Sequence, residues 1–185
     1  MNRKIQTATL AGGCFWCTEA IFMRLKGVLS VVPGYVGGTI RNPTYEQVCS
    51  GKTGHAEAIR IKFDPEQIPY EKILDVFWHT HDPITYNRQG SDIGPQYRSA
   101  IFYHDSAQKR TAELSKAKLE KEKVFAGPVV TEITPFTDFY PAEDYHMDYY
   151  GRNKNESYYT FIIHPKIIKL INLYSRNIKD EYMKQ

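Results

Sequence analysis

The chain has 185 residues, of which 42% are hydrophobic and 24% are charged, and its formal net charge is +3. These values are typical of a globular protein with one sizeable core, and they exclude a disordered chain. Basic and acidic residues are interspersed along the sequence, which argues against a nucleic-acid-binding protein. No apolar run approaches the ~18 residues of a membrane span, and residues 1–11 lack the pattern of a signal peptide. We therefore expect a single catalytic domain, residues 1–185, in the cytoplasm.

The hydrophobic pattern of the first third switches between the period of a strand and that of a helix. A short strand is expected at residues 6–10. A helix is expected at residues 15–26, closed by Gly27. A β-branched strand at residues 28–35 and a short helix at residues 45–49 follow.

The rest of the chain continues this mixture. Residues 58–63 alternate between apolar and basic side chains, which predicts a half-buried strand. Pro69 suits the first turn of a helix that runs to about residue 79. The remaining expected elements are a strand at 99–103, a charged helix at 105–125, a strand at 129–134, and helices at 142–150 and 165–175.

The order of these elements indicates the fold class. Strands and helices alternate irregularly and some strands follow one another directly, which favours an α+β domain over a doubly wound one. We expect a two-layer sandwich, with helices packed on a mixed sheet and a ferredoxin-like core. Residues 160–185 predict an extra C-terminal helix.

The three cysteines, Cys14, Cys17 and Cys49, are too few for a disulfide scaffold in a chain of this length. In a reducing compartment a C-x-x-C pair indicates redox chemistry or a metal site. Cys14 lies where the expected strand passes into the expected helix, and the positive end of a helix stabilises a thiolate. Gly12 and Gly13 allow a tight turn there and leave space for a ligand. Cys17 lies about one turn further, so a sulfenic acid on Cys14 could condense with it.

Other interpretations of the pair stay open. The two cysteines could be small buried hydrophobic residues at a helix start. They could also be half of a zinc site, for which His79 and His81 are the only obvious further ligands. A thioredoxin-like general disulfide oxidoreductase would explain the pair as well.

Two aromatic residues, Phe15 and Trp16, adjoin Cys14. Aromatic rings beside a reactive sulfur can form an apolar pocket for a methyl or thioether group. A lone aromatic residue is more often part of the core. Because both flank the same sulfur, the pattern favours a pocket.

Several polar residues are candidates for acid and hydrogen-bonding roles. Glu57 begins a strand among small residues, and burial there would keep its carboxyl neutral. Tyr45 and Tyr97 can donate hydrogen bonds without charge, and Asp92 can bind a backbone amide of a peptide. Glu19 is a rival acid, although its position in the first helical turn suits a capping role. Each also has an ordinary structural explanation, and spacing alone does not assemble them into one site.

Several segments, taken together and in order, resemble the A-type peptide methionine sulfoxide reductases, which act on the S epimer of methionine sulfoxide. The similarity runs from about residue 8 to about residue 155, which is far more specific than any single motif. The segments that carry it are residues 12–16, 34–38, 42–45, 53–57, 90–99 and 139–146.

This resemblance implies a compact α+β core without a metal or an organic cofactor, with electrons supplied by thioredoxin. We also expect a monomer. It also implies a division of labour among the residues above. The implied roles are Cys14 as nucleophile, Phe15 and Trp16 as walls for the methyl group, Glu57 as acid, Tyr45 and Tyr97 as contacts of the sulfoxide oxygen, and Asp92 as a contact of the substrate backbone.

The sequence departs from the family pattern at two places. Position 17 is often glycine in the family, whereas this chain has Cys17. Many members carry resolving cysteines near the C-terminus, after a tyrosine that Tyr158 resembles, but no cysteine follows Cys49 here. We therefore assign resolution of the Cys14 sulfenic acid to Cys17, with Cys49 as the fallback.

Overall fold

The computed structural model of the protein describes residues 4–153 and 156–183. Its main sheet has six strands in the order β7-β6-β1-β3-β2-β8. These strands are β1 (Gln6–Gly12), β2 (Val28–Val36), β3 (Ala56–Phe63), β6 (Ser99–Tyr103), β7 (Glu132–Pro135) and β8 (Phe139–Pro141). A small separate hairpin is formed by β4 (Arg88–Gln89) and β5 (Asp92–Ile93).

Six α-helices accompany the strands in the described part of the chain. They are α1 (Phe15–Phe22), α2 (Tyr45–Cys49), α3 (Tyr70–Thr80), α4 (Ser106–Lys121), α5 (Tyr149–Arg152) and α6 (His164–Tyr174). No helix in this part is long and apolar enough to cross a membrane.

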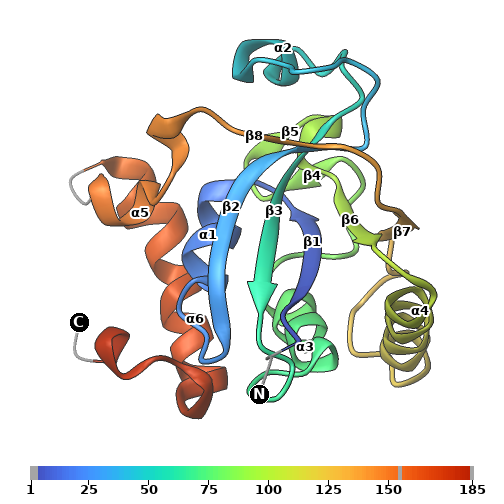
Figure 1. Cartoon of the computed structure of the whole chain (residues 1–185), viewed down its shortest axis with the longest axis vertical. Coiled ribbons are helices and arrows are strands. Elements are labelled where there is room, and N and C mark those ends of the chain that lie inside the picture. The colour runs from blue at the N-terminus through green and yellow to red at the C-terminus, as the bar shows by residue number, and fades with distance from the viewer. Residues whose placement is uncertain (1–3, 154–155, 184–185) are drawn as a thin grey trace.

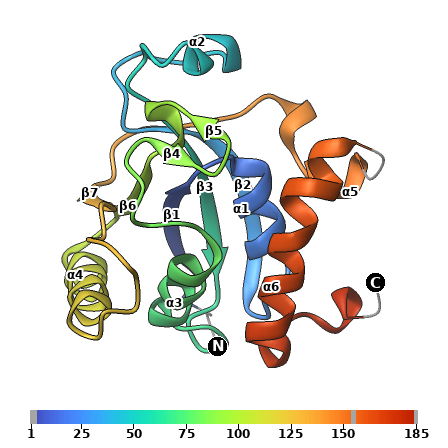
Figure 2. The ribbon, with the colours of Figure 1, turned by 180° about the vertical axis from the view of Figure 1, so that it is seen from behind.

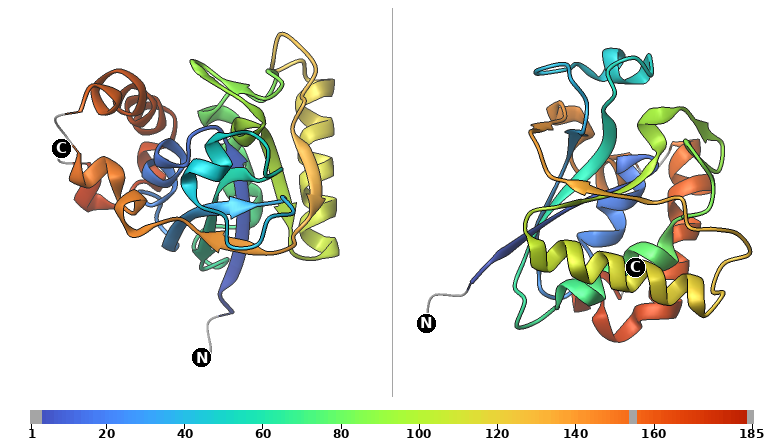
Figure 3. Two further views of the ribbon diagram at one scale, coloured as in Figure 1. Left: turned by 90° about the horizontal axis from the view of Figure 1, so that it is seen from above. Right: turned by 90° about the vertical axis from the view of Figure 1, so that its right-hand side faces the viewer.

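The sheet is mixed, because β6 and β7 are parallel whereas the other neighbouring strands are antiparallel. In Figure 1 the strands lie in front of α1 and α3, and the view from behind in Figure 2 shows α1, α3 and α6 on the near side. Helix α4 lies along the β6–β7 edge, as Figure 3 shows from above. The expected α+β class, with helices packed on a mixed sheet, is therefore confirmed.

The alternation in β3 explains how the sheet is covered. Ile59, Ile61 and Phe63 are fully buried in the core between the sheet and the helices, whereas Lys62 is exposed. The opposite face of the sheet carries a smaller cluster, built mainly from alanines and packed against Phe136 and Phe139. The helical face therefore holds most of the apolar core, and it is there that α1 begins.

Two expected helices differ from the structure. The helix expected at 15–26 ends at Phe22, because the chain turns and Leu25 instead forms a β-bridge with Ile178. The helix expected at 142–150 is wrong. Only a 3₁₀ turn at Asp144–His146 and the short α5 form there, and Asp148 between them has a left-handed φ of 49°.

The C-terminal prediction is confirmed in part. Helix α6 occupies the centre of residues 160–185, preceded by a π-helical turn at Tyr159–Ile163. Two short 3₁₀ turns follow it, and residues 184–185 lie outside the described residues. The hairpin β4–β5 and strand β8 had no counterpart in the sequence prediction, since each has only two or three residues.

Candidate active site

Cys14 lies at the junction of β1 and α1, as the sequence predicts. It is the N-cap residue of α1, and its carbonyl accepts a 3.1 Å hydrogen bond from the Cys17 N–H. Gly13 precedes it with a φ of +85°, a conformation that glycine adopts without strain. The tight turn before the cysteine is therefore confirmed.

The expectation that the glycines leave space for a ligand is wrong. A Cβ atom on Gly13 would collide with the side chain of Gln89, and one on Gly12 would touch Phe77 and His81. Gln89 is itself held by hydrogen bonds to both backbone groups of Asp82. The glycines thus let the β4–β5 hairpin and α3 approach the turn closely.

The two thiols of the C-x-x-C pair are free and buried, with Cys14 6% exposed and Cys17 1% exposed. A side-chain hydrogen bond joins them. Burial, Cys17 and the nearby Glu57 raise the pKa of Cys14. The hydrogen bond from Cys14, together with Lys166, lowers the pKa of Cys17 to about 7. The expected stabilisation of a Cys14 thiolate by the helix is therefore outweighed by burial, and Cys17 carries the more acidic thiol.

Glu57 reaches the same turn from β3. Its Oε2 accepts a 3.0 Å hydrogen bond from the backbone N–H of Phe15, and the residue is 1% exposed. Burial raises the pKa of this carboxyl to about 8, against the lowering effect of the Phe15 N–H, while Asp92 and Cys17 raise it further. The carboxyl beside Cys14 is therefore mostly neutral at pH 7, as an acid requires.

The predicted hydrogen-bonding residues gather around this carboxyl. Tyr45 and Tyr97 are half-buried, and burial followed by the effect of Glu57 raises the pKa of Tyr97. The hydroxyl of Tyr45 forms a hydrogen bond with Cys49, and burial, this bond and Glu57 raise its pKa. Both phenols thus remain neutral donors at physiological pH.

Phe15 and Trp16 lie within a larger aromatic cluster. The Phe15 ring is buried and its centroid lies 6.4 Å from that of Tyr45. Trp16 is half-buried and stacks on Tyr149, with centroids 3.6 Å apart and an interplanar angle of 5°. The indole Nε1–H donates a 2.9 Å hydrogen bond to Nδ1 of His146. Stacking on Tyr149 and the hydrogen bond to His146 therefore both hold the Trp16 ring in place.

The sequence prediction missed the C-terminal half of the site. His146, Tyr149 and Tyr158 surround Trp16, and the Tyr158 hydroxyl donates a 2.9 Å hydrogen bond to Asp92. The same hydroxyl forms a hydrogen bond with Cys14. His146 lies in the segment 139–146 that carries the family resemblance, but no periodicity or spacing assigns a role to His146, Tyr149 or Tyr158.

The residues left as alternatives have other partners. The carboxylate of Glu19 accepts a 3.0 Å hydrogen bond from the Asp148 N–H, so it caps α5 rather than acting at Cys14. His81 bonds to the Phe77 carbonyl and to Ser99, and His79 bonds to the Asp75 carbonyl. No group of three or more potential metal ligands is found among residues 4–153 and 156–183.

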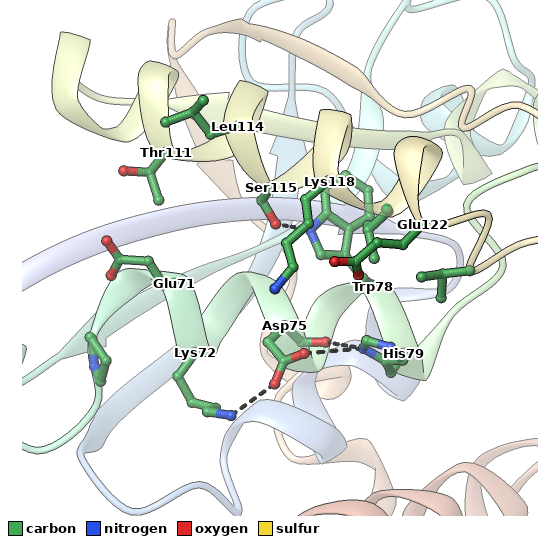
Figure 4. Close-up of a pocket in the computed structure, with 13 residues that line it drawn as sticks. Glu71, Lys72, Asp75, Trp78, His79, Thr111, Leu114, Ser115, Lys118 and Glu122 are labelled. Atoms are coloured by element: carbon green, nitrogen blue, oxygen red, sulfur yellow. Dashed lines mark hydrogen bonds and ion pairs between the residues drawn. The ribbon is translucent and has the colours of Figure 1, made fainter.

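A pocket lies between α3 and α4 (Figure 4). Its volume is about 650 Å³, and Trp78 at its floor donates a 2.8 Å hydrogen bond to Ser115. Asp75 in its wall pairs with Lys72 at 2.8 Å and with His79 at 3.3 Å. The predicted site residues are absent from its lining, so this pocket does not locate the chemistry.

Comparisons with known proteins give matches over most of the chain. Residues 6–178 match the sequence model of the family described as "Peptide methionine sulfoxide reductase". The chain is 54% identical over 167 residues to peptide methionine sulfoxide reductase MsrA of Sulfolobus acidocaldarius, a match that covers 90% of this chain and 94% of that protein. It is 53% identical over 164 residues to MsrA of Thermus thermophilus, covering 89% and 92%.

Solved structures give the same similarity. The reduced form of Mxr1 from Saccharomyces cerevisiae matches with a TM-score of 0.77 at 32% identity, covering 84% of this chain and 90% of that one. Mxr1 has also been crystallised in complex with Trx2.

Proposed function

This chain belongs to the peptide methionine sulfoxide reductase family and reduces methionine sulfoxide, and on that premise we propose that Cys14 is the attacking sulfur and Glu57 the acid. The observation that carries this proposal is the 3.0 Å hydrogen bond from the Phe15 N–H to Glu57. It brings a buried carboxyl with a pKa of about 8 to the residue that follows Cys14. The carboxyl of Glu57 and the sulfur of Cys14 are thereby held at the same turn, where β1 passes into α1.

In the first step the Cys14 sulfur attacks the sulfoxide sulfur while Glu57 protonates the oxygen. The oxygen and this proton end on Cys14 as a sulfenic acid, so Cys14 is oxidised by two electrons and methionine leaves. Cys14 donates its hydrogen bond to Cys17, so the proton that Cys14 must lose has an acceptor beside it. This arrangement compensates for the raised pKa of Cys14.

In the second step Cys17 attacks the Cys14 sulfenic acid. The S–S bond forms as the S–O bond breaks, and the hydroxide leaves as water with a proton from solvent. The Cys14–Cys17 hydrogen bond supports this pairing, because it holds the two side chains in contact before oxidation. A thioredoxin-type reductant reopens the disulfide, and the complex of the related Mxr1 with Trx2 supports that choice of partner.

Substrate recognition follows from the surroundings of Cys14. The walls of the methyl pocket are Phe15 and Trp16, and the donors to the sulfoxide oxygen are Tyr45 and Tyr97. Asp92 holds the substrate backbone, and its hydrogen bond from Tyr158 keeps it in place. Because methyl, oxygen and backbone each have a separate contact, only one configuration at sulfur fits all three, and we assign it as the S epimer.

One experiment tests these assignments together. The reduced enzyme is mixed with each epimer of methionine sulfoxide, the methionine released is counted, and the disulfide is mapped by mass spectrometry. We expect release from the S epimer alone and a Cys14–Cys17 disulfide. Cys14→Ser should be inactive, whereas Cys17→Ser should release about one methionine per enzyme and then stall with thioredoxin.

Cys49→Ser is the matched control, and it should turn over repeatedly. Full turnover by Cys17→Ser would exclude Cys17 as the resolving residue and favour Cys49. Rapid reduction of insulin disulfides without reduction of methionine sulfoxide would instead indicate a general disulfide oxidoreductase.

We further propose a ferredoxin-like core. The order β6-β1-β3-β2, with antiparallel neighbours and with α1 and α3 as connections, supports it. The main apolar core includes residues from β1 to α6, which supports one catalytic domain over residues 1–185. Since one chain supplies all the site residues, we propose a monomer, which light scattering would test. A C-x-x-C disulfide that a thioredoxin-type reductant must reopen favours a reducing compartment, and we propose the cytoplasm.

A further inference from the structure

Lys166 lies on the buried face of α6. It is three residues after Ile163 and four before Leu170, both fully buried, and it is next to the buried Ile167. Residues with this spacing share one face of a helix, so the lysine leaves α6 on the side that packs against the protein. Helix α6 runs beside α1, as Figure 2 shows. A cation at such a position needs a partner.

That partner is the sulfur of Cys17. The Lys166 ammonium forms a hydrogen bond with Cys17, which is 1% exposed on α1. No salt bridge joins Lys166 to an acidic side chain in the described ranges 4–153 and 156–183. The ammonium also lies close enough to His81 of α3 to act on its charge. The lysine thus enters the protein at the contact of α6 with α1 and α3.

We propose that Lys166 is a positioning residue that keeps the Cys17 sulfur as a thiolate while Cys17 attacks the oxidised Cys14. This inference rests on the proposed function, in which Cys17 resolves the sulfenic acid. The thiolate is the nucleophile in such exchange, so the fraction ionised sets the rate. The need for Lys166 is greatest at this step, because Cys17 must release the proton that it accepted and the oxidised Cys14 no longer donates the thiol hydrogen bond that lowers the pKa of Cys17.

The other groups that face Cys17 cannot replace the lysine. They are Cys14 at the start of α1, Glu57 on β3 and the hydroxyl of Tyr158. Burial raises the pKa of Tyr158 far above its ordinary value, so it is a neutral donor. An ionised Glu57 would disfavour a thiolate nearby. Lys166 is the cation that lowers the pKa of Cys17.

The contact between Lys166 and Cys17 also determines which sulfur of the disulfide the reductant attacks. When a thiolate of the reductant attacks the disulfide, the sulfur whose thiol has the lower pKa leaves faster. Lys166 makes Cys17 that leaving group, and Cys14 is the more exposed of the two residues. The mixed disulfide with the reductant therefore forms on Cys14. One S–S bond breaks and one forms, and the electron pair stays on Cys17.

The test uses Lys166→Met with Lys166→Arg, which keeps the charge, and with Lys169→Met as the matched control. Lys169 is exposed on the same helix. After one turnover with methionine sulfoxide, closure of the disulfide is followed by quenching between pH 6 and pH 10. In the reduced enzyme the pKa of Cys17 is about 7, lowered first by the hydrogen bond from Cys14 and then by Lys166, so at most about half of Cys17 is ionised at pH 7 once Cys14 is oxidised. Without either partner the pKa takes its ordinary value of 9.0, at which about one-hundredth is ionised at pH 7, so these two fractions are the limits of the effect of Lys166.

A less acidic thiol is also the stronger nucleophile once ionised, with a Brønsted coefficient of about 0.4–0.5. Combining the two effects, Lys166→Met should close the disulfide up to about 6-fold more slowly at pH 7 and up to about 7-fold faster near pH 10. The two pH profiles must therefore cross. Lys166→Arg and Lys169→Met should follow the wild type, and every variant should still release about one methionine per enzyme in the first turnover.

Loss of packing alone cannot produce such a crossing, since it changes the rate in one direction at every pH. If Lys166→Met releases methionine and forms the Cys14–Cys17 disulfide with the wild-type pH profile, the role of Lys166 is refuted and the proposed function stands. If the wild type releases no methionine, or pairs Cys14 with Cys49, both proposals fail. A uniform slowing that Lys166→Arg does not rescue also refutes the role of Lys166.

Discussion

The backbone N–H of Phe15 donates a 3.0 Å hydrogen bond to Oε2 of Glu57, although the two residues are 42 positions apart. The bond ties β3 to the first residue of α1 and keeps the carboxyl beside Cys14. It also lowers the pKa of Glu57, but burial dominates and raises that pKa to about 8. The position and the protonation of the acid thus have separate causes, so they can be tested separately.

Glu57→Gln should keep the position of this side chain and remove its proton. The amide oxygen can still accept from Phe15, so the turn should survive. We expect the single-turnover release of methionine to fall by about 10²–10⁴-fold, the usual contribution of a general acid. In the wild type the rate should decrease above about pH 8, where the carboxyl ionises, and the variant should lack this decrease.

The control for this prediction is Glu19→Gln. Burial raises the pKa of Glu19 as well, to about 7, but its carboxyl caps α5. Its variant should therefore retain the wild-type rate and the decrease above pH 8. A Glu57→Gln enzyme with an undiminished rate would rule out the acid role.

Trp16→Phe should weaken substrate binding while leaving the fold intact. The variant keeps an aromatic ring to stack on Tyr149 but loses the indole donor to His146. A hydrogen bond of this kind contributes about 0.5–1.5 kcal/mol, so kcat/KM should fall by about 2- to 12-fold. Steady-state kinetics with thioredoxin would measure this loss.

The double variant Trp16→Phe/His146→Asn shows whether the bond itself is responsible. If Trp16 acts through His146, the kcat/KM of the double variant should be no lower than that of the less active single variant. Fully additive losses would mean that the two residues act independently.

The parts of the site that the sequence predicts are those with a local signal. A strand followed by two glycines and a helical pattern locates Cys14, and a strand start among small residues locates Glu57. The hydrogen bonds from Trp16 to His146 and from Tyr158 to Asp92 join residues 130 and 66 positions apart, and no local pattern encodes them.

The dependence of structure on residues far apart in the sequence also explains why some of the sequence predictions are wrong. The helix start at Cys14 is a local feature and predicts a stabilised thiolate, but the depth of burial is set by the whole fold and raises the pKa instead. The helix expected at 142–150 has a plausible local pattern. It is broken because Asp148 turns into the left-handed region, where its side chain caps α5 and its N–H meets Glu19.

His81 should make the folded protein sensitive to acid. Burial lowers its pKa from 6.5 to about 4 in the native state. Between these pH values His81 is protonated in the unfolded chain but neutral in the native state. The free energy of unfolding therefore falls as pH decreases from 6.5 to 4. The loss is up to about 3 kcal/mol, and above pH 6.5 His81 adds no pH dependence.

Urea unfolding of His81→Gln and the wild type between pH 4.5 and pH 7.5 would test this. The variant loses the hydrogen bonds to Ser99 and Phe77, so it should be less stable at pH 7, but its stability should change less with pH. His79→Gln is the control, since that ring is half-buried and bonds to Asp75 on the same helix. Stability curves for His81→Gln and the wild type that run parallel throughout would contradict the prediction.

Gly13→Ala should disturb the turn that presents Cys14. The φ of +85° strains any residue with a Cβ, and that atom would also overlap Gln89. Gly90→Ala separates the two effects, because its φ is +62° but no described atom lies within 4 Å of an added Cβ. We expect Gly90→Ala to cost about 1 kcal/mol from the backbone alone, and Gly13→Ala to cost more.

The additional loss of stability in Gly13→Ala, compared with Gly90→Ala, should depend on the side chain of Gln89. In a double-mutant cycle, Gln89→Gly removes both overlapping atoms, the Cβ and the Cγ of Gln89, and also its hydrogen bonds to Asp82. The loss in the Gly13→Ala/Gln89→Gly protein should therefore be smaller than the sum of the two single losses, by about 0.5–3 kcal/mol. Denaturant unfolding measures all four corners of the cycle. Strict additivity would mean that strain at φ, and not the contact with the β4–β5 hairpin, is what requires a glycine before Cys14.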